Sequence, residues 1–146
     1  STESNMNNKI NRSHLLVIVA VFCIIISGCL GGGAMSDLPD CETLYGAAGY
    51  WDNCQGTEFL PNGDKYVGEY VADLFHGQGA YTGSNGGQYV GEHKDGLPNG
   101  YGTMTSSNGD QWTGNFKDGL RHGQGTATLS NGDQYTGEWK EGKFVG

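Results

Sequence analysis

The sequence predicts an all-β fold of antiparallel β-hairpins that stack side by side as repeats. Two observations support this prediction. One framework recurs every 23 residues from about residue 53 to the end of the 146-residue chain. Each unit contains an Asn-Gly pair between alternating segments, the strongest short-range signal for a hairpin. Fixed periods of this length are typical of repeat architectures, in which each unit packs on its neighbours.

Aromatic and glycine positions define the repeat. An aromatic residue, a glycine and a second aromatic residue alternate along one segment, so all three are expected on one face of a strand. Aliphatic side chains are few, so we expect a core of aromatic rows with glycine gaps that allow close approach. The framework residues are Tyr66, Gly68, Tyr70, Gly77, Gly79, Tyr89, Gly91, Gly100, Gly102, Trp112, Gly114, Phe116, Gly123, Gly125, Tyr135, Gly137 and Trp139.

The Asn-Gly pairs predict where each hairpin turns. Four of them, spaced by 23 residues, lie at 62–63, 85–86, 108–109 and 131–132. A two-residue type I′ turn needs positive φ at both central positions, which Asn-Gly tolerates. The cross-strand pairs expected from such a turn are Phe59–Tyr66, Thr82–Tyr89, Thr105–Trp112 and Thr128–Tyr135. A single hairpin is not stable alone, so the units are expected to stack side by side.

The beginning of the chain has the features of an exported protein. Met6 is the expected start, and Lys9 and Arg12 precede an unbroken apolar run of twelve residues at 15–26. That run is too short to span a bilayer comfortably, which favours a secretory signal peptide over a short membrane-anchor helix.

The end of this leader contains a possible lipidation site. Ile26-Ser27-Gly28-Cys29 resembles the lipobox of bacterial lipoproteins, in which the cysteine becomes the acylated N-terminus. The resemblance implies lipid attachment at Cys29, and several acyl chains would give stable anchoring. Because Leu30 and not Asp follows, it also implies a bacterial cell envelope location, at the outer membrane facing the periplasm or the cell surface if the host is Gram-negative.

The remaining cysteines indicate a disulfide, and the net charge excludes some classes of partner. Cys41 and Cys54 are an even pair in an exported chain, which favours a disulfide over a metal site, since no histidine lies between them. From residue 29 onward, six Lys and Arg face fifteen Asp and Glu. A surface this acidic repels phosphate backbones and anionic headgroups, so we expect no nucleic acid and no phosphoinositide partner.

The repeated motifs resemble the MORN repeat. The matching stretches are Tyr66-Val67-Gly68-Glu69-Tyr70, His76-Gly77-Gln78-Gly79, Tyr89-Val90-Gly91-Glu92, Trp112-Thr113-Gly114-Asn115-Phe116 and Arg121-His122-Gly123-Gln124-Gly125. This resemblance implies a single-layer, elongated and twisted sheet, a solenoid of stacked antiparallel β-hairpins. In this family such surfaces serve protein binding, self-association or, in some proposals, membrane contact. Two residues depart from the pattern: His93 replaces an aromatic residue and Asn99 replaces a histidine, which predicts a looser second unit.

The predicted organisation has seven parts. They are upstream residues and a lipoprotein signal peptide (1–28), a lipidated cysteine and flexible tether (29–40), a degenerate cap and half repeat stapled by Cys41 and Cys54 (41–65), three full repeats (66–88, 89–111 and 112–134) and a partial repeat (135–146). The partial repeat stops halfway through a unit, so we expect a truncated sequence or a further cap. An unpaired strand there would permit self-association through the sheet edge.

Residues with catalytic or ligand-binding potential have simpler explanations in a repeat. His76 and His122 share one phase but lie about 19 Å apart across four strands, so one metal ion cannot join them. Asp64, Asp110 and Asp133 follow the Asn-Gly pairs, where carboxylates usually satisfy turn backbone groups. Gly77-Gln78-Gly79 lacks the third glycine and the helix start of a phosphate loop. Glu69, Glu92, Asn115 and Glu138 form a row on the polar face, open to a basic partner or cations but more simply explained as a solvated face.

We therefore predict a non-enzymatic, lipid-anchored envelope protein that presents a β surface to an unknown protein partner, with no cofactor and no metal. Two alternatives stay open. One is a lipid- or envelope-polymer-binding module that uses the aromatic face. The other is an accessory repeat of an enzyme whose catalytic domain lies beyond residue 146.

Overall fold

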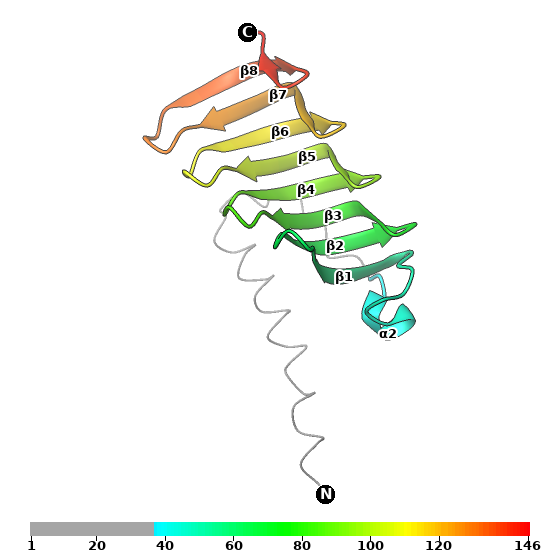
Figure 1. Cartoon of the computed structure of the whole chain (residues 1–146). Helices are drawn as coiled ribbons and strands as arrows, with labels where there is room; N and C mark the ends of the chain where they lie inside the picture. Colours follow the sequence, from blue (N-terminus) through cyan, green and yellow to red (C-terminus); the bar gives the residue numbers. More distant parts are fainter. Residues whose placement is uncertain (1–36) are drawn as a thin grey trace, which may run out of the picture. The chain divides into compact units, whose positions relative to one another are not determined.

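The computed structural model describes residues 37–146. The expected signal peptide, Cys29 and the tether up to residue 36 lie outside the described residues. Residues 37–146 form one nine-stranded sheet in which the strands follow each other in chain order, all antiparallel (Figure 1). The prediction of a single sheet of successive hairpins is confirmed.

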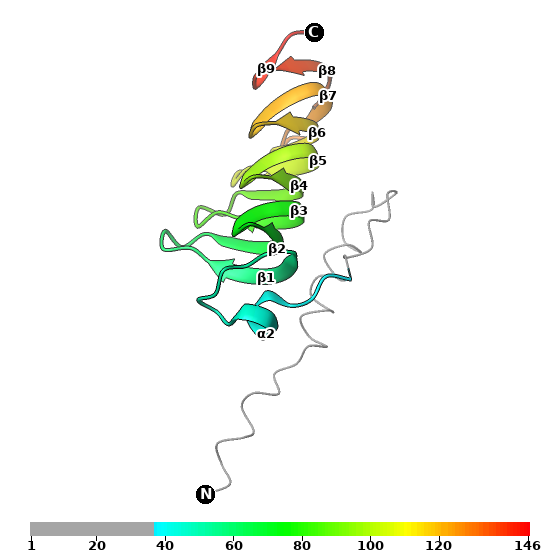
Figure 2. The same ribbon diagram turned by 90° about the vertical axis from the view of Figure 1, so that its right-hand side faces the viewer.

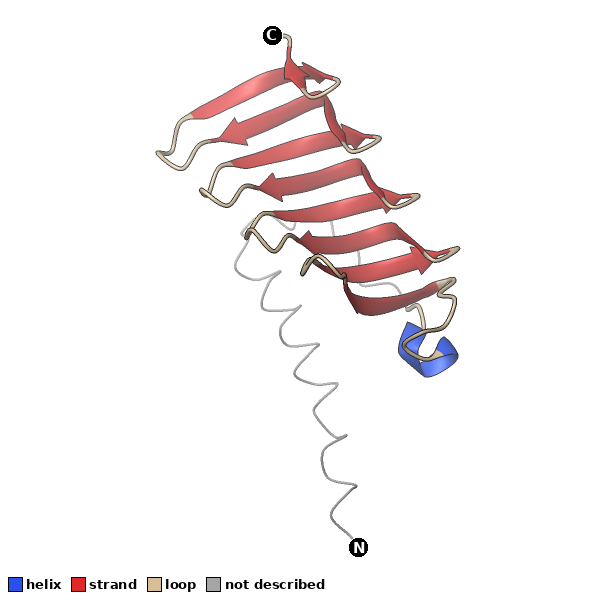
Figure 3. Ribbon diagram, viewed as in Figure 1, coloured by secondary structure: helices blue, strands red, loops and turns tan. Residues whose placement is uncertain are grey.

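The strands have similar lengths from one repeat to the next, except for the two-residue β9. They are β1 (Cys54–Phe59), β2 (Lys65–Val71), β3 (Leu74–Thr82), β4 (Gln88–Lys94), β5 (Leu97–Thr105), β6 (Gln111–Lys117), β7 (Leu120–Thr128), β8 (Gln134–Lys140) and β9 (Lys143–Phe144). Short loops join them on alternating sides (Figure 3). Within residues 37–146, the one helix is α2 (Cys41–Tyr45), and no helix there has the length and apolarity to cross a membrane.

The loops that contain Asn-Gly differ from the prediction. Five residues, such as those at 83–87, separate the paired strand ends, and Gly86 N–H donates to the Gly83 carbonyl at 2.9 Å. Gly86 has a φ of 88°, whereas Asn85 is not among the residues with positive φ. The two-residue type I′ turn was therefore wrong: asparagine occupies the third position of a wider turn, and only glycine takes the left-handed conformation.

The wider loop shifts the register of every hairpin by one residue. The expected pairs Phe59–Tyr66, Thr82–Tyr89, Thr105–Trp112 and Thr128–Tyr135 were therefore wrong. The observed pairs are Glu58–Tyr66, Tyr81–Tyr89, Met104–Trp112 and Ala127–Tyr135. The alternation along each strand is unaffected, so the aromatic residues still share one face.

Two-residue turns do occur, at the opposite side of the sheet. Asp95 and Gly96 have φ of 51° and 84°, and they connect the paired residues Lys94 and Leu97. Asp118-Gly119 and Glu141-Gly142 repeat this geometry. We call this side the turn edge and the side of the five-residue loops the loop edge.

The second glycine motif of each repeat forms a β-bulge. Gly68 pairs with Gly79, but the next residue, Glu69, pairs with His76, so Gly77 and Gln78 have no partner on β2. The same shift occurs between β4 and β5 and between β6 and β7. Gly77 has a φ of 55°, a conformation that favours glycine, and the later bulges have Gly100 and Gly123 there at 110° and 71°.

The glycines of successive strands join into one row across the sheet. Each member is the direct cross-strand partner of the next: Gly56, Gly68, Gly79, Gly91, Gly102, Gly114, Gly125 and Gly137. A Cβ on Gly102 would lie 2.6 Å from Cζ of Tyr89, and one on Gly114 would lie 2.8 Å from the Trp112 ring. The row therefore forms the floor on which the aromatic rings lie.

The rings above this floor form the core of the sheet. Successive rings meet edge-to-face with centroids 4.7–5.8 Å apart, and they form one path: Trp51, Tyr70, Tyr66, His93, Tyr89, Phe116, Trp112, Trp139 and Phe144. Edge-to-face pairs of this kind contribute about 0.5–1.5 kcal/mol each beyond area burial. The strands curve as they cross the sheet (Figure 2), and the central rings, including His93, are at most 4% exposed. The path is not interrupted at His93, where we had expected a looser unit.

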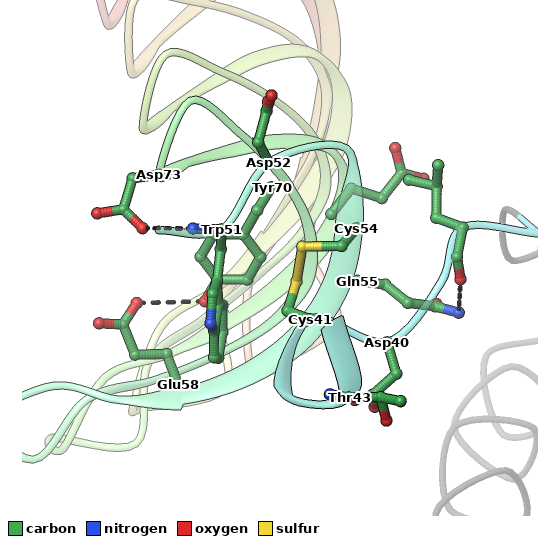
Figure 4. The surroundings of a disulfide bond; sticks show 12 residues. Asp40, Cys41, Thr43, Trp51, Asp52, Cys54, Gln55, Glu58, Tyr70 and Asp73 are labelled. Atoms are coloured by element: carbon green, nitrogen blue, oxygen red, sulfur yellow. Dashed lines mark hydrogen bonds between the residues drawn. A yellow bond between two sulfur atoms is a disulfide. The ribbon is translucent and has the colours of Figure 1, made fainter. Parts of the chain in front are cut away.

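The segment before β1 closes the first repeat. A disulfide joins Cys41 of α2 to Cys54 of β1, with 5.1 Å between the Cα atoms, and both residues are fully buried (Figure 4). Trp51 packs beside it against Tyr70 with centroids 4.8 Å apart, and its indole N–H donates to the Gly46 carbonyl at 3.0 Å. Tyr50, by contrast, is 61% exposed and takes no part in this packing.

Candidate functional site

The aromatic face is a packed core and offers little surface to a ligand. Tyr66, Tyr89, Trp112 and Phe116 are each at most 3% exposed. Burial raises the pKa of the Tyr66 and Tyr89 hydroxyls well above the ordinary value. These hydroxyls are not free to act on a ligand, because that of Tyr89 donates to the Glu92 carbonyl at 2.9 Å.

His93 is the one buried histidine on the central part of this face. Its Nδ1 lies 3.1 Å from the Gly91 carbonyl oxygen, whereas Nε2 is buried without a hydrogen-bond partner. Burial lowers the pKa of His93 to about 4, partly offset by the contact with Gly91. The imidazole is therefore neutral at physiological pH and behaves as an aromatic packing group.

The loop edge carries aspartates that connect one repeat to the next. Asp64 Oδ1 accepts a hydrogen bond from Ser84 N–H at 2.8 Å, and its Oδ2 accepts one from the Tyr81 hydroxyl. Asp110 accepts from Ser130 N–H in the same way, at 2.8 Å. These bonds hold the pKa of Asp64 and Asp110 below the ordinary value, the largest contribution coming from Tyr81 and Ser130 respectively. The aspartates are structural links between loops.

The turn edge carries a row of partly exposed leucines. Leu74, Leu97 and Leu120 begin β3, β5 and β7 and are 44%, 48% and 50% exposed. A Cβ on Gly96 would lie 3.9 Å from Leu74 Cδ2, and Leu97 and Leu120 lie equally close to Gly119 and Gly142, so each leucine lies over the next turn and the three form a row. Regularly spaced, half-exposed leucines are unlike singly scattered apolar residues and mark a candidate interaction surface.

Charges of both signs flank this leucine row. Five of the six Lys and Arg residues of the described chain lie in or beside the turns of this edge: Lys94, Lys117, Arg121, Lys140 and Lys143. Asp95, Asp118 and Glu141 lie within the turns themselves. Arg121 also stacks 4.6 Å from the centroid of the Trp139 ring. An apolar strip with a mixed charged border is the arrangement found in protein–protein interfaces.

The face opposite the aromatic rings is polar. The hydroxyls of Thr103 and Thr113 lie 2.9 Å apart across neighbouring strands, and those of Thr126 and Thr136 repeat this contact. The expected row of Glu69, Glu92, Asn115 and Glu138 lies on this face. The carboxylates of Glu69 and Glu92 fold over the bulge glycines, so that a Cβ on Gly77 or Gly100 would be 2.7 Å from the carboxylate carbon.

The histidines at the bulges do not converge on a metal site. His76 lies on β3, where its Nδ1 is buried without a hydrogen-bond partner, and His122 lies two repeats away on β7. Within residues 37–146, no group of three or more His, Cys, Asp and Glu side chains could hold a metal ion.

Sequence reasoning missed three features of these surfaces. The turn-edge leucines keep the same 23-residue period, and Leu97 and Leu120 directly follow Asp-Gly pairs, whereas Leu74 follows Ala72-Asp73. Their period and the turn signal of the two Asp-Gly pairs could have revealed them. The hydrogen bonds from Asp64 and Asp110 to the next loop had no local signal, because they depend on how repeats stack. The glycine row likewise had no local signal. Glycines of neighbouring strands become direct partners only through the register in which the strands pair.

Together these features define a single-sheet repeat protein whose exposed surfaces extend with each added hairpin. The family model described as the MORN repeat matches residues 66–88, 89–111, 112–134 and 135–146, which is more than half of the chain. The chain therefore belongs to the MORN repeat family. A comparison with curated proteins finds no significant match.

Proposed function

We propose that this protein is a non-enzymatic interaction module that binds a protein partner through the turn edge. The observation that carries the proposal is the row of Leu74, Leu97 and Leu120, half-exposed at equivalent positions of three successive repeats. Burying a leucine that is half exposed contributes about 1 kcal/mol, so three together give a useful apolar centre for binding. The lysines and carboxylates around it would set the orientation of the partner.

Other features support a binding role over catalysis. The family match consists of MORN repeats, with no enzyme domain identified. The described carboxylates and histidines are spread along the repeat and do not converge on one point, which acid–base catalysis requires. The acidic composition argues against nucleic acid and anionic lipid as the partner.

We also propose that the module is tethered to a bacterial envelope through lipid on Cys29. The basis is the leader with its apolar run at 15–26 and the lipobox-like Ile26-Ser27-Gly28-Cys29. Metabolic labelling with an alkyne-bearing fatty acid tests this. Label on the full chain but not on Cys29→Ser supports it, and equal labelling of both proteins would contradict it.

Site-specific photo-crosslinking in the producing cell tests the binding surface. A photoreactive amino acid at Leu97 is expected to give a discrete cross-linked species, and the same residue at Thr113 on the polar face is the matched control. Leu97→Glu should abolish cross-linking from position 120 without unfolding the protein. Strong cross-links from Thr113 and none from the turn edge would place the interaction on the other face and sink the proposal.

Vesicle sedimentation separates this function from lipid binding. The unlipidated Cys29→Ser protein is mixed with neutral vesicles and with anionic vesicles. We expect it to stay in the supernatant with both, because the charge is unfavourable for anionic lipid and the aromatic rings are buried. Co-sedimentation would instead favour the lipid-binding alternative.

A further inference from the structure

The four loops of the loop edge form a natural comparison series. Each presents an exposed Asn-Gly pair in the same five-residue turn. The glycine N–H of each pair donates to the residue three positions earlier, with N···O distances of 2.8–2.9 Å in all four loops. The backbone environment of the Asn-Gly bond is therefore closely matched, and differences among the loops arise from side chains.

Three of the asparagines are held by an aspartate two residues later. In the third repeat, Asn108 Nδ2 donates to Asp110 Oδ2 at 2.9 Å, and Asp110 N–H donates back to Asn108 Oδ1 at 3.0 Å. The loops with Asn62–Asp64 and Asn131–Asp133 have the same reciprocal pair. Both polar ends of these amide side chains are thus fixed.

The remaining loop, at 83–87, has Gly87 in place of that aspartate. Asn85 Oδ1 still accepts a hydrogen bond from Gly87 N–H at 2.9 Å. Its Nδ2 donates to no residue in the described part of the chain. The loop also contains Gly83, Gly86 and Gly87, whereas the other three loops contain one glycine each. Its amide side chain and its backbone are therefore less restrained than those of the other three.

We propose that Asn85 is the preferred site of spontaneous deamidation in this protein. The backbone nitrogen of Gly86 attacks Cγ of Asn85, a new N–Cγ bond forms, and the Cγ–Nδ2 bond breaks. Ammonia leaves with the amide proton of Gly86, and a five-membered succinimide results. Water then opens either carbonyl to give aspartate or isoaspartate, with no oxidant or cofactor. The missing side chain at Gly86 leaves the attacking nitrogen unhindered.

The hydrogen bonds predict a graded order among the four sites. The attack requires the asparagine side chain to rotate, and one hydrogen bond fewer corresponds to about a fivefold higher population of the rotated state. Asp64 and Asp110 are themselves fixed by Ser84 and Ser130 of the next loop. Asp133 is bonded only within its own loop among the described residues. Asn85 is therefore fastest, Asn131 intermediate, and Asn62 and Asn108 slowest.

The product changes the surface at the loop edge between β3 and β4. Conversion adds one negative charge to the protein, and the isoaspartate form also lengthens the backbone by one atom within the turn. The aspartate form places a carboxylate at position 85, whereas the other loops have their own carboxylate two positions later, at the equivalent of Gly87.

Peptide mapping of the full chain tests the proposal. The protein is incubated at neutral pH, and the mass increase and isoaspartate content of each Asn-Gly peptide are followed with time. Asn85 is expected to convert about fivefold faster than Asn108. The fifth Asn-Gly pair, Asn99-Gly100 within β5, is followed in the same digest.

Reciprocal variants separate loop structure from local sequence. Gly87 is not in the left-handed region, and a Cβ there would meet Asn85 Oδ1 at 3.2 Å, so Gly87→Asp is sterically acceptable and should slow Asn85 to the rate of Asn108. Asp110→Gly should accelerate Asn108 correspondingly. In concentrated guanidinium the folded-state differences should disappear. Equal rates at Asn85 and Asn108 in the folded protein, or an unchanged Asn85 rate in Gly87→Asp, would overturn the proposal.

Discussion

The imidazole of His93 packs edge-to-face on the ring of Tyr89, with centroids 5.0 Å apart. On its other side it meets Tyr66 in the same way, at 5.1 Å. The equivalent position holds Tyr70, Phe116 or Trp139 in the other repeats. The second repeat thus has a titratable ring inside a row that is otherwise uncharged at every accessible pH.

This position makes stability depend on acid pH. The pKa of His93 is lowered from 6.5 to about 4 in the folded state, so the unfolded chain binds the proton more readily between these values. Stability is therefore complete above about pH 6.5 and falls as pH drops towards 4, by about 3 kcal/mol in total. The titratable groups that face the ring, Tyr66 and Tyr89, stay neutral throughout this window. Urea unfolding at a series of pH values measures the effect.

Two variants identify the residue responsible. His93→Phe should remove most of the pH dependence in this window and keep the edge-to-face contacts. His122→Asn, which removes a partly exposed histidine of another repeat, should leave the dependence in place. A His93→Phe protein that still loses the same stability on acidification would show that the acid sensitivity lies elsewhere.

The periodic framework predicted the sheet well because each repeat depends on local rules. Alternation determines which side chains share a face, and it placed Trp112, Gly114 and Phe116 on the same face of β6, where the structure buries all three. The type of turn was harder to predict from the sequence. Asn-Gly is compatible both with a two-residue turn and with the third and fourth positions of a five-residue loop. The aspartate after it, as in Asn108–Asp110, stabilises the wider loop by a reciprocal hydrogen-bond pair.

The hydroxyl of Tyr89 stabilises the β-bulge next to it. It donates to the Glu92 carbonyl at 2.9 Å, at the point where β4 and β5 lose their regular pairing. Tyr89→Phe leaves this carbonyl without its partner and should lower the free energy of unfolding by about 1 kcal/mol. Chemical denaturation measures the change. Tyr135→Phe is the matched control, since Tyr135 is 52% exposed, and a loss of similar size in that variant would be inconsistent with the hydrogen bond as the cause.

Glycines of the row are required because an added side chain would clash, not because of their backbone φ. Gly102 lies beneath the buried Tyr89 ring, where an added Cβ would be 2.6 Å from Cζ. Gly102→Ala forces the ring or the strand to move and should destabilise the protein by about 1–3 kcal/mol. Gly87→Ala is the control, because the nearest atom to its Cβ is the mobile Asn85 side chain. Equal thermal unfolding midpoints for the two variants would refute the close approach.

The candidate surface was harder to predict than the fold. The leucine row was accessible in principle, because its period equals that of the framework. Its exposure was not, since only the narrow turns at Asp95-Gly96 and Asp118-Gly119 bring successive leucines to one edge. The burial of Phe116 likewise became clear only from the structure. In a one-layer sheet, the repeat pattern is the same for an aromatic residue that packs in the core and for one that contacts a partner.

The disulfide closes a short loop at the start of the sheet. Cys41 and Cys54 are separated by 13 positions, and closing a loop of that size stabilises the folded state by about 3 kcal/mol in the chain-entropy model. The bond fixes α2 beside β1 and keeps Trp51 against Tyr70 (Figure 4). The double variant Cys41→Ala, Cys54→Ala should therefore unfold at a lower denaturant concentration, with the first repeat affected most.

Thiol labelling and hydrogen exchange together check this local effect. In the protein isolated without reductant, neither Cys41 nor Cys54 should react with a thiol reagent until a reductant is added. In the double variant, amide exchange should accelerate in β1 and β2 and remain slow in β6 and β7, because each repeat is stabilised chiefly by its neighbours. Labelling of both cysteines without reductant would contradict the disulfide. Uniformly faster exchange across all strands would instead show that the sheet unfolds as one cooperative unit, with the disulfide stabilising all of it.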